Sequence, residues 1–140
     1  MRRILVVDDD ASLLRLVRDI LERQGYEVMQ ASSGAEALAV ISREGLPHLA
    51  IVDLVMPGMS GFEFARQVQS YVDLPMIILT AVTEEQTVVQ GIQRYAEDYI
   101  TKPFRPREFA ARVDRVLRRM GDYAYALAPI MQVDKQLEVD

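Results

Sequence analysis

Short apolar runs alternate with amphipathic segments along the first 120 residues, and this alternation restricts the chain to a narrow group of folds. Three of the runs, at residues 4–7, 49–52 and 76–79, are wholly apolar, which is typical of strands buried on both faces of a parallel sheet. The segments between the runs space their apolar residues as helices do. The predicted strands cover residues 4–7, 26–30, 49–52, 76–79 and 98–101, and the predicted helices cover residues 11–24, 34–44, 61–70, 84–95 and 106–120.

Strands that alternate with helices need crossover connections, so the sequence predicts an α/β fold with a parallel five-stranded sheet and helices on both faces. The chain has 140 residues, half of them apolar, which is enough for one domain with a real core. We expect this domain to occupy residues 1–120.

The predicted helix ends carry capping signals. Ser33 and Ser60 each precede a glutamate by three residues, the pattern of a capping box, and the segment 83–86 repeats it. Gly25 and Gly45 follow the last apolar residues of two helices, where glycine commonly ends a helix. We therefore expect well-defined starts and stops for the helices.

Composition excludes several functions. The net charge of −5 argues against nucleic-acid binding by this chain itself, because phosphate backbones bind to basic surfaces. There is no cysteine, which suits a reducing compartment, and no apolar run approaches membrane-spanning length. The apolar run after Met1 is too short for a signal peptide. We expect a cytoplasmic protein without a membrane partner. The single histidine, His48, lies in a connection and is assigned no role.

Polar side chains follow the predicted strands at the points where the strands end. Asp8 and Asp9 follow the first strand, Asp53 follows the third, Thr80 the fourth and Lys102 the fifth. Because the carboxyl ends of parallel strands meet at one edge of the sheet, we expect these side chains to converge there. A lone aspartate at a strand end more often only starts a turn, so the convergence carries the prediction.

Three crowded carboxylates repel each other unless a cation lies between them or their pKa values rise. An all-oxygen cluster selects a hard ion, and Mg²⁺ is the expected one. With Mg²⁺ bound, Asp53 can act as a nucleophile toward phosphorus. Lys102, one of only two lysines in the chain, then supplies a positive charge, and the Thr80 hydroxyl supplies a hydrogen bond.

At these residues the chain resembles the response-regulator receiver domain of two-component signalling. No single motif is specific, but together and in this order they are. The matching segments are Ile4-Leu5-Val6-Val7-Asp8-Asp9-Asp10, Asp53-Leu54-Val55-Met56-Pro57-Gly58-Met59-Ser60-Gly61, Leu79-Thr80-Ala81 and Asp98-Tyr99-Ile100-Thr101-Lys102-Pro103-Phe104. The resemblance implies the flavodoxin-like fold, a doubly wound (βα)5 sandwich with strand order 2-1-3-4-5.

The resemblance also implies roles for individual residues. Asp53 would accept a phosphoryl group from a sensor histidine kinase and would ligate Mg²⁺ together with Asp9 and the main-chain carbonyl of Val55, while Asp8 would act mostly through water. Thr80 and Tyr99 would form the switch pair, in which Thr80 moves to the phosphoryl group and Tyr99 turns into the vacated space. Lys102 would bind the phosphate. The protein would then be a regulator and not an enzyme with a separate substrate.

Within receivers, the last segment is similar to the OmpR/PhoB class of transcriptional regulators. The resemblance implies a homodimer through the fourth helix, fifth strand and fifth helix, with ion pairs between the two copies. The candidate residues are Glu97, Asp98, Arg112, Arg115, Arg118 and Arg119. Residues 121–140 would be a linker and the start of a truncated winged-helix domain, through which alone the protein would bind DNA. The rival interpretation is an accidental C-terminal extension.

The chain departs from the receiver pattern at a few positions. Tyr95 stands where the family usually has glycine, so the turn into the fifth strand is either distorted or carries an unusual partner surface. Arg105 is a poor capping residue for the last helix. Val55 and Val82 flank the expected path of an attacking water, and neither can orient it, so we expect slow self-dephosphorylation.

Two other functions remain open from the sequence. Asp8-Asp9-Asp10-Ala11-Ser12 approximates the motif of haloacid dehalogenase-type phosphatases, with Asp8 as nucleophile and Asp10 as acid/base. The chain is short for that family, and Asp53 would go unexplained. The other possibility is a receiver-like module that signals without phosphate. Labelling by a small phosphodonor distinguishes the three functions.

Overall fold

The computed structural model describes residues 2–83, 85 and 95–120. Five parallel strands form one sheet in the order β2-β1-β3-β4-β5. The strands are β1 (Arg3–Val7), β2 (Glu27–Ala31), β3 (Leu49–Val52), β4 (Met76–Thr80) and β5 (Asp98–Thr101). The helices among the described residues are α1 (Ala11–Arg23), α2 (Gly34–Glu44), α3 (Gly61–Gln69) and a fourth over residues 106–120. The predicted flavodoxin-like fold and its strand order are confirmed.

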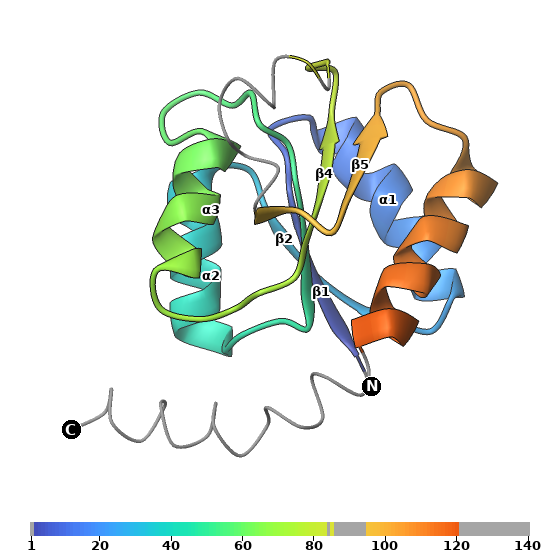
Figure 1. Cartoon of the computed structure of the whole chain (residues 1–140), viewed down its shortest axis with the longest axis horizontal. Coiled ribbons are helices and arrows are strands. Elements are labelled where there is room, and N and C mark those ends of the chain that lie inside the picture. The colour runs from blue at the N-terminus through green and yellow to red at the C-terminus, as the bar shows by residue number, and fades with distance from the viewer. Residues whose placement is uncertain (1, 84, 86–94, 121–140) are drawn as a thin grey trace.

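Helices cover both faces of the sheet, as Figure 1 shows: α2 and α3 lie on one face, and α1 and the 106–120 helix lie on the other. Successive residues of each inner strand point to opposite faces of the sheet and pack in two separate cores. Leu5 and Val7 of β1 belong to the core under α2 and α3, and Ile4 and Val6 belong to the core under the other two helices. The apolar runs are therefore uninterrupted because both faces of the inner strands are buried.

The capping prediction holds at the ends that the structure describes. The hydroxyl oxygens of Ser33 and Ser60 accept the main-chain N–H groups of Glu36 and Glu63, each at 3.1 Å. Asp10, which sequence reasoning did not identify as a cap, accepts the N–H groups that follow it at the start of α1. The predicted helix 84–95 falls largely on residues outside the described part of the chain, as does the expected start of a winged-helix domain within residues 121–140.

His48 has a partner that sequence reasoning missed. Its main-chain N–H donates to the carbonyl of Arg3 at 2.8 Å, and its Nδ1 accepts the N–H of Arg3 at 3.0 Å. Partial burial, followed by the nearby charges of Arg2 and Arg3, lowers the pKa of His48, which keeps the ring a neutral acceptor. This histidine connects the chain before β3 to the start of β1.

Among the described residues, no helix is long and apolar enough to cross a membrane.

Three polar contacts fix one flank of the 106–120 helix to the end of α1 and the starts of β1 and β2. Gln24 donates to the carbonyl of Ala110 at 3.0 Å, Arg2 donates to that of Leu117 at 2.5 Å, and the Tyr26 hydroxyl donates to the carboxylate of Asp114. The helix residues are spaced by four and three, so they lie on one face. Burial, followed by the bond to Asp114, raises the pKa of Tyr26 to about 12.

We predict that Tyr26→Phe lowers the free energy of unfolding by about 1 kcal/mol at pH 7, the usual net contribution of one hydrogen bond. Because the pKa of Tyr26 is raised above its ordinary 10.0, this stabilisation is complete below pH 10 and is lost as the pH rises through about 12. Urea unfolding of both proteins from pH 7 to 12 measures the difference. A difference that stays constant up to pH 12 would contradict the assignment.

Candidate functional site

The predicted site residues meet at the edge of the sheet where the strands end, which is at the top of Figure 1. The strand register brings them there. The N–H of Asp53 donates to the carbonyl of Val7 at 3.0 Å, which sets the end of β3 beside the end of β1. The N–H of Lys102 donates to the carbonyl of Thr80 at 3.0 Å, which sets the end of β5 beside the end of β4. Residues far apart in sequence thus share one edge.

Lys102 is the centre of this group of side chains. Its Nζ lies 2.7 Å from Asp8 Oδ2 and 2.9 Å from Asp53 Oδ2, so one ammonium bridges two carboxylates. The Thr80 hydroxyl donates to Asp53 Oδ1 at 2.7 Å, and the N–H of Val55 donates to the same oxygen at 3.2 Å. Both oxygens of Asp53 are therefore held, and its carboxylate is fixed in orientation.

Burial separates the three acids. Asp8 is 2% exposed and Asp53 6%, while Asp9 is exposed to solvent. Burial raises the pKa of Asp8, and its hydrogen bonds with Lys102 and the N–H of Asp10 only partly oppose the shift. Burial alone would lower the pKa of Lys102, but its bonds to Asp8 and Asp53 outweigh burial and the net shift is upward. Lys102 therefore keeps its positive charge at neutral pH.

The donor set fits a hard divalent cation. Asp8, Asp9 and Asp53 each offer a carboxylate oxygen, and these oxygens all lie within 4.8 Å of one another. Such a cluster of oxygen ligands without histidine or cysteine suits Mg²⁺, which binds one or two carboxylates and keeps several waters. The exposed side of Asp9 gives the ion an aqueous approach. The part predicted for the main-chain carbonyl of Val55 stays a prediction.

The loop after Asp53 returns close to the main chain of this predicted acceptor, and Gly61 makes this possible. A Cβ at position 61 would lie 2.0 Å from the carbonyl oxygen of Asp53, so only glycine fits there. The N–H of Gly61 donates to the carbonyl of Leu54 at 3.2 Å. The start of α3 is therefore packed directly on the main chain of Asp53. The sequence signal for this contact is the Ser60-Gly61 pair, which the sequence marks as a helix start and as the end of the segment that resembles receiver domains, but not as a close contact with Asp53.

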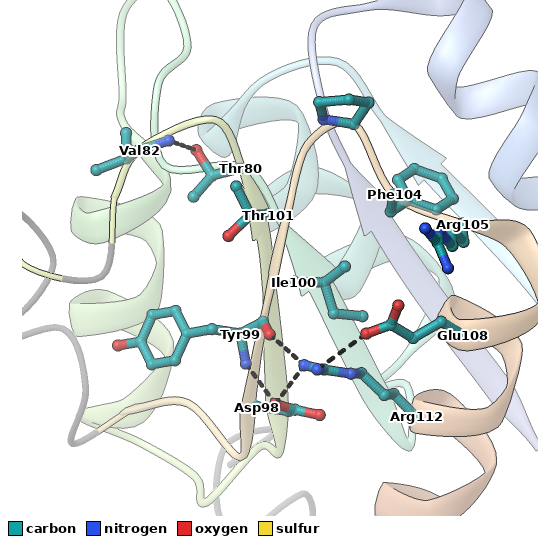
Figure 2. A pocket seen from close by; sticks show the side chains of 11 residues that line it. Thr80, Val82, Asp98, Tyr99, Ile100, Thr101, Phe104, Arg105, Glu108 and Arg112 are labelled. Atoms are coloured by element: carbon teal, nitrogen blue, oxygen red, sulfur yellow. Dashed lines mark hydrogen bonds and ion pairs between the residues drawn. The ribbon is translucent and has the colours of Figure 1, made fainter.

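Thr80 and Tyr99, the predicted switch pair, lie on the neighbouring strands β4 and β5. Thr80 is buried, and its hydroxyl is already bonded to Asp53. The ring of Tyr99 lies on the face of β5 turned toward α2 and α3, whereas Ile100 packs under the helices of the other face, and Figure 2 shows the two side chains on opposite sides of the strand. The proposed exchange of positions between Thr80 and Tyr99 stays a prediction.

Beside β5 lies a pocket of 490 Å³ that extends from Thr80 to Arg112. Figure 2 shows Arg112 reaching across it. Its guanidinium donates to the carbonyl of Tyr99 at 2.6 Å and pairs with Asp98 at 3.2 Å and with Glu108 at 3.0 Å. The 106–120 helix is thus bonded to the main chain of the predicted switch residue, a contact that the sequence did not reveal.

The acids and arginines predicted to pair across a dimer pair within one chain here. Arg115 lies 3.1 Å from Asp98, and Arg119 lies 3.2 Å from Glu97. Arg118 instead donates to the main chain of Asp114 at 3.4 Å. Five of the six predicted residues therefore form two groups of ion pairs, Asp98 with Arg112 and Arg115, and Glu97 with Arg119.

Comparison with known proteins identifies the family. The response regulator receiver domain matches residues 4–114. The chain is 41% identical over 133 residues to the DNA-binding response regulator MtrA of Mycobacterium leprae, which covers 95% of this chain and 59% of that protein. It is 45% identical over 123 residues to the phosphate regulon transcriptional regulatory protein PhoB of Pseudomonas aeruginosa, which covers 86% and 53%. The chain thus spans just over half the length of these curated relatives.

Solved structures of response regulators have the same fold as this chain. A CheY-like receiver domain protein from Methanospirillum hungatei superposes with a TM-score of 0.80 at 31% identity, covering 88% of this chain and 98% of that one. TrrA of Thermotoga maritima, solved in complex with Mg²⁺-BeF, superposes with a TM-score of 0.75 at 35% identity, covering 84% and 100%. Since the family matches most of the chain and the fold and acid cluster agree with it, this chain belongs to the response regulator receiver domain family.

Proposed function

We propose that the chain is a phosphorylation-dependent signalling switch in which Asp53 accepts a phosphoryl group from a sensor histidine kinase. The observation that carries the proposal is the Asp53 carboxylate itself. Asp53 is only 6% exposed, its carboxylate is bonded to Lys102 and Thr80, and it lies within the acid cluster. A structural aspartate at a turn would need none of these partners.

The transfer follows from this geometry. An oxygen of Asp53 attacks phosphorus, a P–O bond forms, and the P–N bond to the kinase histidine breaks with its electron pair returning to the imidazole. The Lys102 ammonium, now close to both Asp8 and Asp53, balances negative charge on a phosphoryl oxygen, and the Thr80 hydroxyl donates to another. When bound, Mg²⁺ would neutralise further charge on the transferred group.

The position of Asp10 argues against the phosphatase alternative. Both oxygens of Asp8 are bonded, by the N–H of Asp10 and by Lys102, but both oxygens of Asp53 are bonded as well, so bonding alone does not distinguish the two acids. The carboxylate of Asp10, which a phosphatase of the haloacid dehalogenase type would use as acid/base, instead caps α1 through the N–H groups of Ser12 and Leu13. This supports the proposal that the chain is a phosphoacceptor whose catalysis would be limited to its own phosphorylation and slow dephosphorylation.

We predict that acetyl phosphate with Mg²⁺ labels the wild-type protein at one site and that Asp53→Asn abolishes the label. Asp8→Asn should slow labelling without removing it, because Asp8 only supports the cation and Lys102. Intact-protein mass spectrometry detects the added phosphoryl group. A label that survives Asp53→Asn and disappears in Asp8→Asn would support the phosphatase alternative instead.

The lifetime of the phosphoryl group depends on how water reaches it. Val55 is 65% exposed beside the acceptor and Val82 is half-buried beyond Thr80. Neither apolar side chain can orient an attacking water or take its proton. We therefore propose that the phosphorylated form is long-lived.

We predict that replacing both valines with polar residues, as in Val55→Asn with Val82→Gln, speeds the loss of the phosphoryl group by about tenfold, below the full effect of a positioned general base. Decay is followed in purified phosphorylated protein with Mg²⁺ present. Val72→Asn, a partly buried valine outside the site, is the matched control. The hypothesis would be contradicted if the wild type lost its phosphoryl group rapidly and the double variant lost it at the same rate.

The output would pass through the face formed by β5, the 106–120 helix and the fourth predicted helix. We propose that a phosphoryl dianion on Asp53 shifts the population of Thr80 and Tyr99 arrangements and that this face then forms a homodimer. The ion pairs of Arg115 and Arg119 support this, because these two arginine side chains are 61% and 52% exposed and can exchange their partners for acids of a second copy.

The wider role rests on the relatives. MtrA is described as a DNA-binding response regulator and PhoB as a transcriptional regulatory protein. We propose that the receiver domain occupies residues 1–120, that residues 121–140 are the linker and the start of a winged-helix domain, and that DNA is bound through that further domain in the cytoplasm. The acidic receiver itself is not a DNA-binding surface.

We predict that Arg115→Glu weakens the dimerisation induced by Mg²⁺ and beryllofluoride by about tenfold, the scale of one close charge pair. Combining it with Asp98→Arg should restore part of the loss, since opposite charges again face each other. Arg107→Glu, an exposed arginine on the same helix, is the charge-matched control. Sedimentation of the treated proteins measures the dimer constant, and equal losses in the Arg107 and Arg115 variants would contradict the proposed face.

A further inference from the structure

An aromatic contact joins the segment before β5 to the first turn of α3. The ring of Tyr95 meets the ring of Phe62 edge-on, with centroids 6.3 Å apart and an angle of 70° between the planes. The guanidinium of Arg66 lies 5.8 Å from the centroid of the same Phe62 ring. Edge-to-face rings attract each other through their quadrupoles, and a cation over a ring adds to this. A glycine at position 95 could not make this contact.

Phe62 is connected to Asp53, the proposed phosphoacceptor, through the contacts of its neighbour in the chain, Gly61. It follows Gly61, which packs against the carbonyl of Asp53 with no room for a side chain and donates its N–H to the carbonyl of Leu54. Ser60 caps the same turn through the N–H of Glu63. Any shift of the main chain after Asp53 must therefore move the first turn of α3, and the ring of Phe62 moves with it.

Tyr95 is connected in a similar way to Tyr99, the predicted switch residue. The N–H of Glu97, two residues further along, donates to the carbonyl of Met76 at 2.7 Å and fixes the entry to β5. Tyr95, Tyr99 and Phe62 all pack against the same core, the one under α2 and α3. A change in the position of Tyr95 therefore acts on the strand that carries Tyr99, which lies four residues after it.

We infer that Phe62 and Tyr95 are positioning residues that couple the acceptor loop to β5, in addition to the contact through Thr80. The inference rests on the proposed function, because it concerns how a phosphoryl group on Asp53 is sensed at β5. The contact gives this chain a second connection that crosses the α3 side of the sheet and does not involve the Thr80 hydroxyl. Pairs of this geometry correspond to about a two- to tenfold change in an equilibrium constant.

The test is amide hydrogen exchange over residues 95–101, with and without Mg²⁺ and beryllofluoride, a mimic of the phosphoryl group. We expect the wild type to change its exchange rates in this segment when the mimic binds. Tyr95→Leu and Phe62→Leu should each reduce the change by about two- to tenfold. The double variant should lose no more than the Phe62→Leu variant, because both single changes remove the same Phe62–Tyr95 contact.

Two controls separate positioning from general loss of stability. Tyr95→Phe keeps the ring and should respond as the wild type does, while Tyr71→Leu removes an aromatic that is 70% exposed and should also respond normally. If Tyr95→Leu is poorly folded by circular dichroism, Phe62→Leu decides the question.

The outcomes are distinguishable. A wild type that shows no response to the mimic overturns the proposed function together with this inference. A wild type that responds, with leucine variants that respond equally, overturns the inference alone. Additive losses in the double variant would likewise show that the two rings act independently, and the coupling would be refuted.

Discussion

The structure depends on one lysine shared by two nearly buried carboxylates. Asp8 and Asp53 leave adjacent strands of the sheet, and without a cation between them their mutual repulsion and loss of hydration would oppose folding. Lys102 comes from the far edge strand, and its ammonium reaches both acids within 3 Å. Under the proposed function, the same positive charge would be available to an arriving phosphoryl group, because it is shared between the two acids.

How much of this was readable from the sequence depends on the range of the interaction. The inner strands were predictable because short, wholly apolar runs between amphipathic segments are typical of strands buried on both faces of a parallel sheet. In a parallel sheet, the convergence of Asp8, Asp53, Thr80 and Lys102 then follows from the topology alone. The serine caps were predictable because their partners lie three residues away.

Contacts that depend on side-chain conformation across the fold were not predictable in this way. The acids Glu97 and Asp98 were recognised as ionic partners of the arginines, but the sequence pattern could not distinguish pairing within a chain from pairing between chains. The packing of Tyr95 on Phe62 was also missed, although Tyr95 had been noted as an unusual residue. In both cases the deciding quantity is a distance between segments far apart in sequence, and residue periodicity carries no information about it.

The two charged regions of the molecule differ in how readily they can rearrange. At the acid cluster, removing Lys102 from Asp8 or Asp53 would leave a buried charge without its partner, so movement there requires a new charge to arrive at the same time. Beside β5, the Arg119 and Glu97 side chains are 52% and 37% exposed, so water screens their pair and it contributes little to stability. Asp98 is only 16% exposed and is shared by Arg112 and Arg115. The fold therefore places its most buried charges at the sheet edge and its more exposed ion pairs beside β5. Under the proposed function, one added dianion would act on the buried charges, and a different set of surface ion pairs would be the result, without destabilising the core between them.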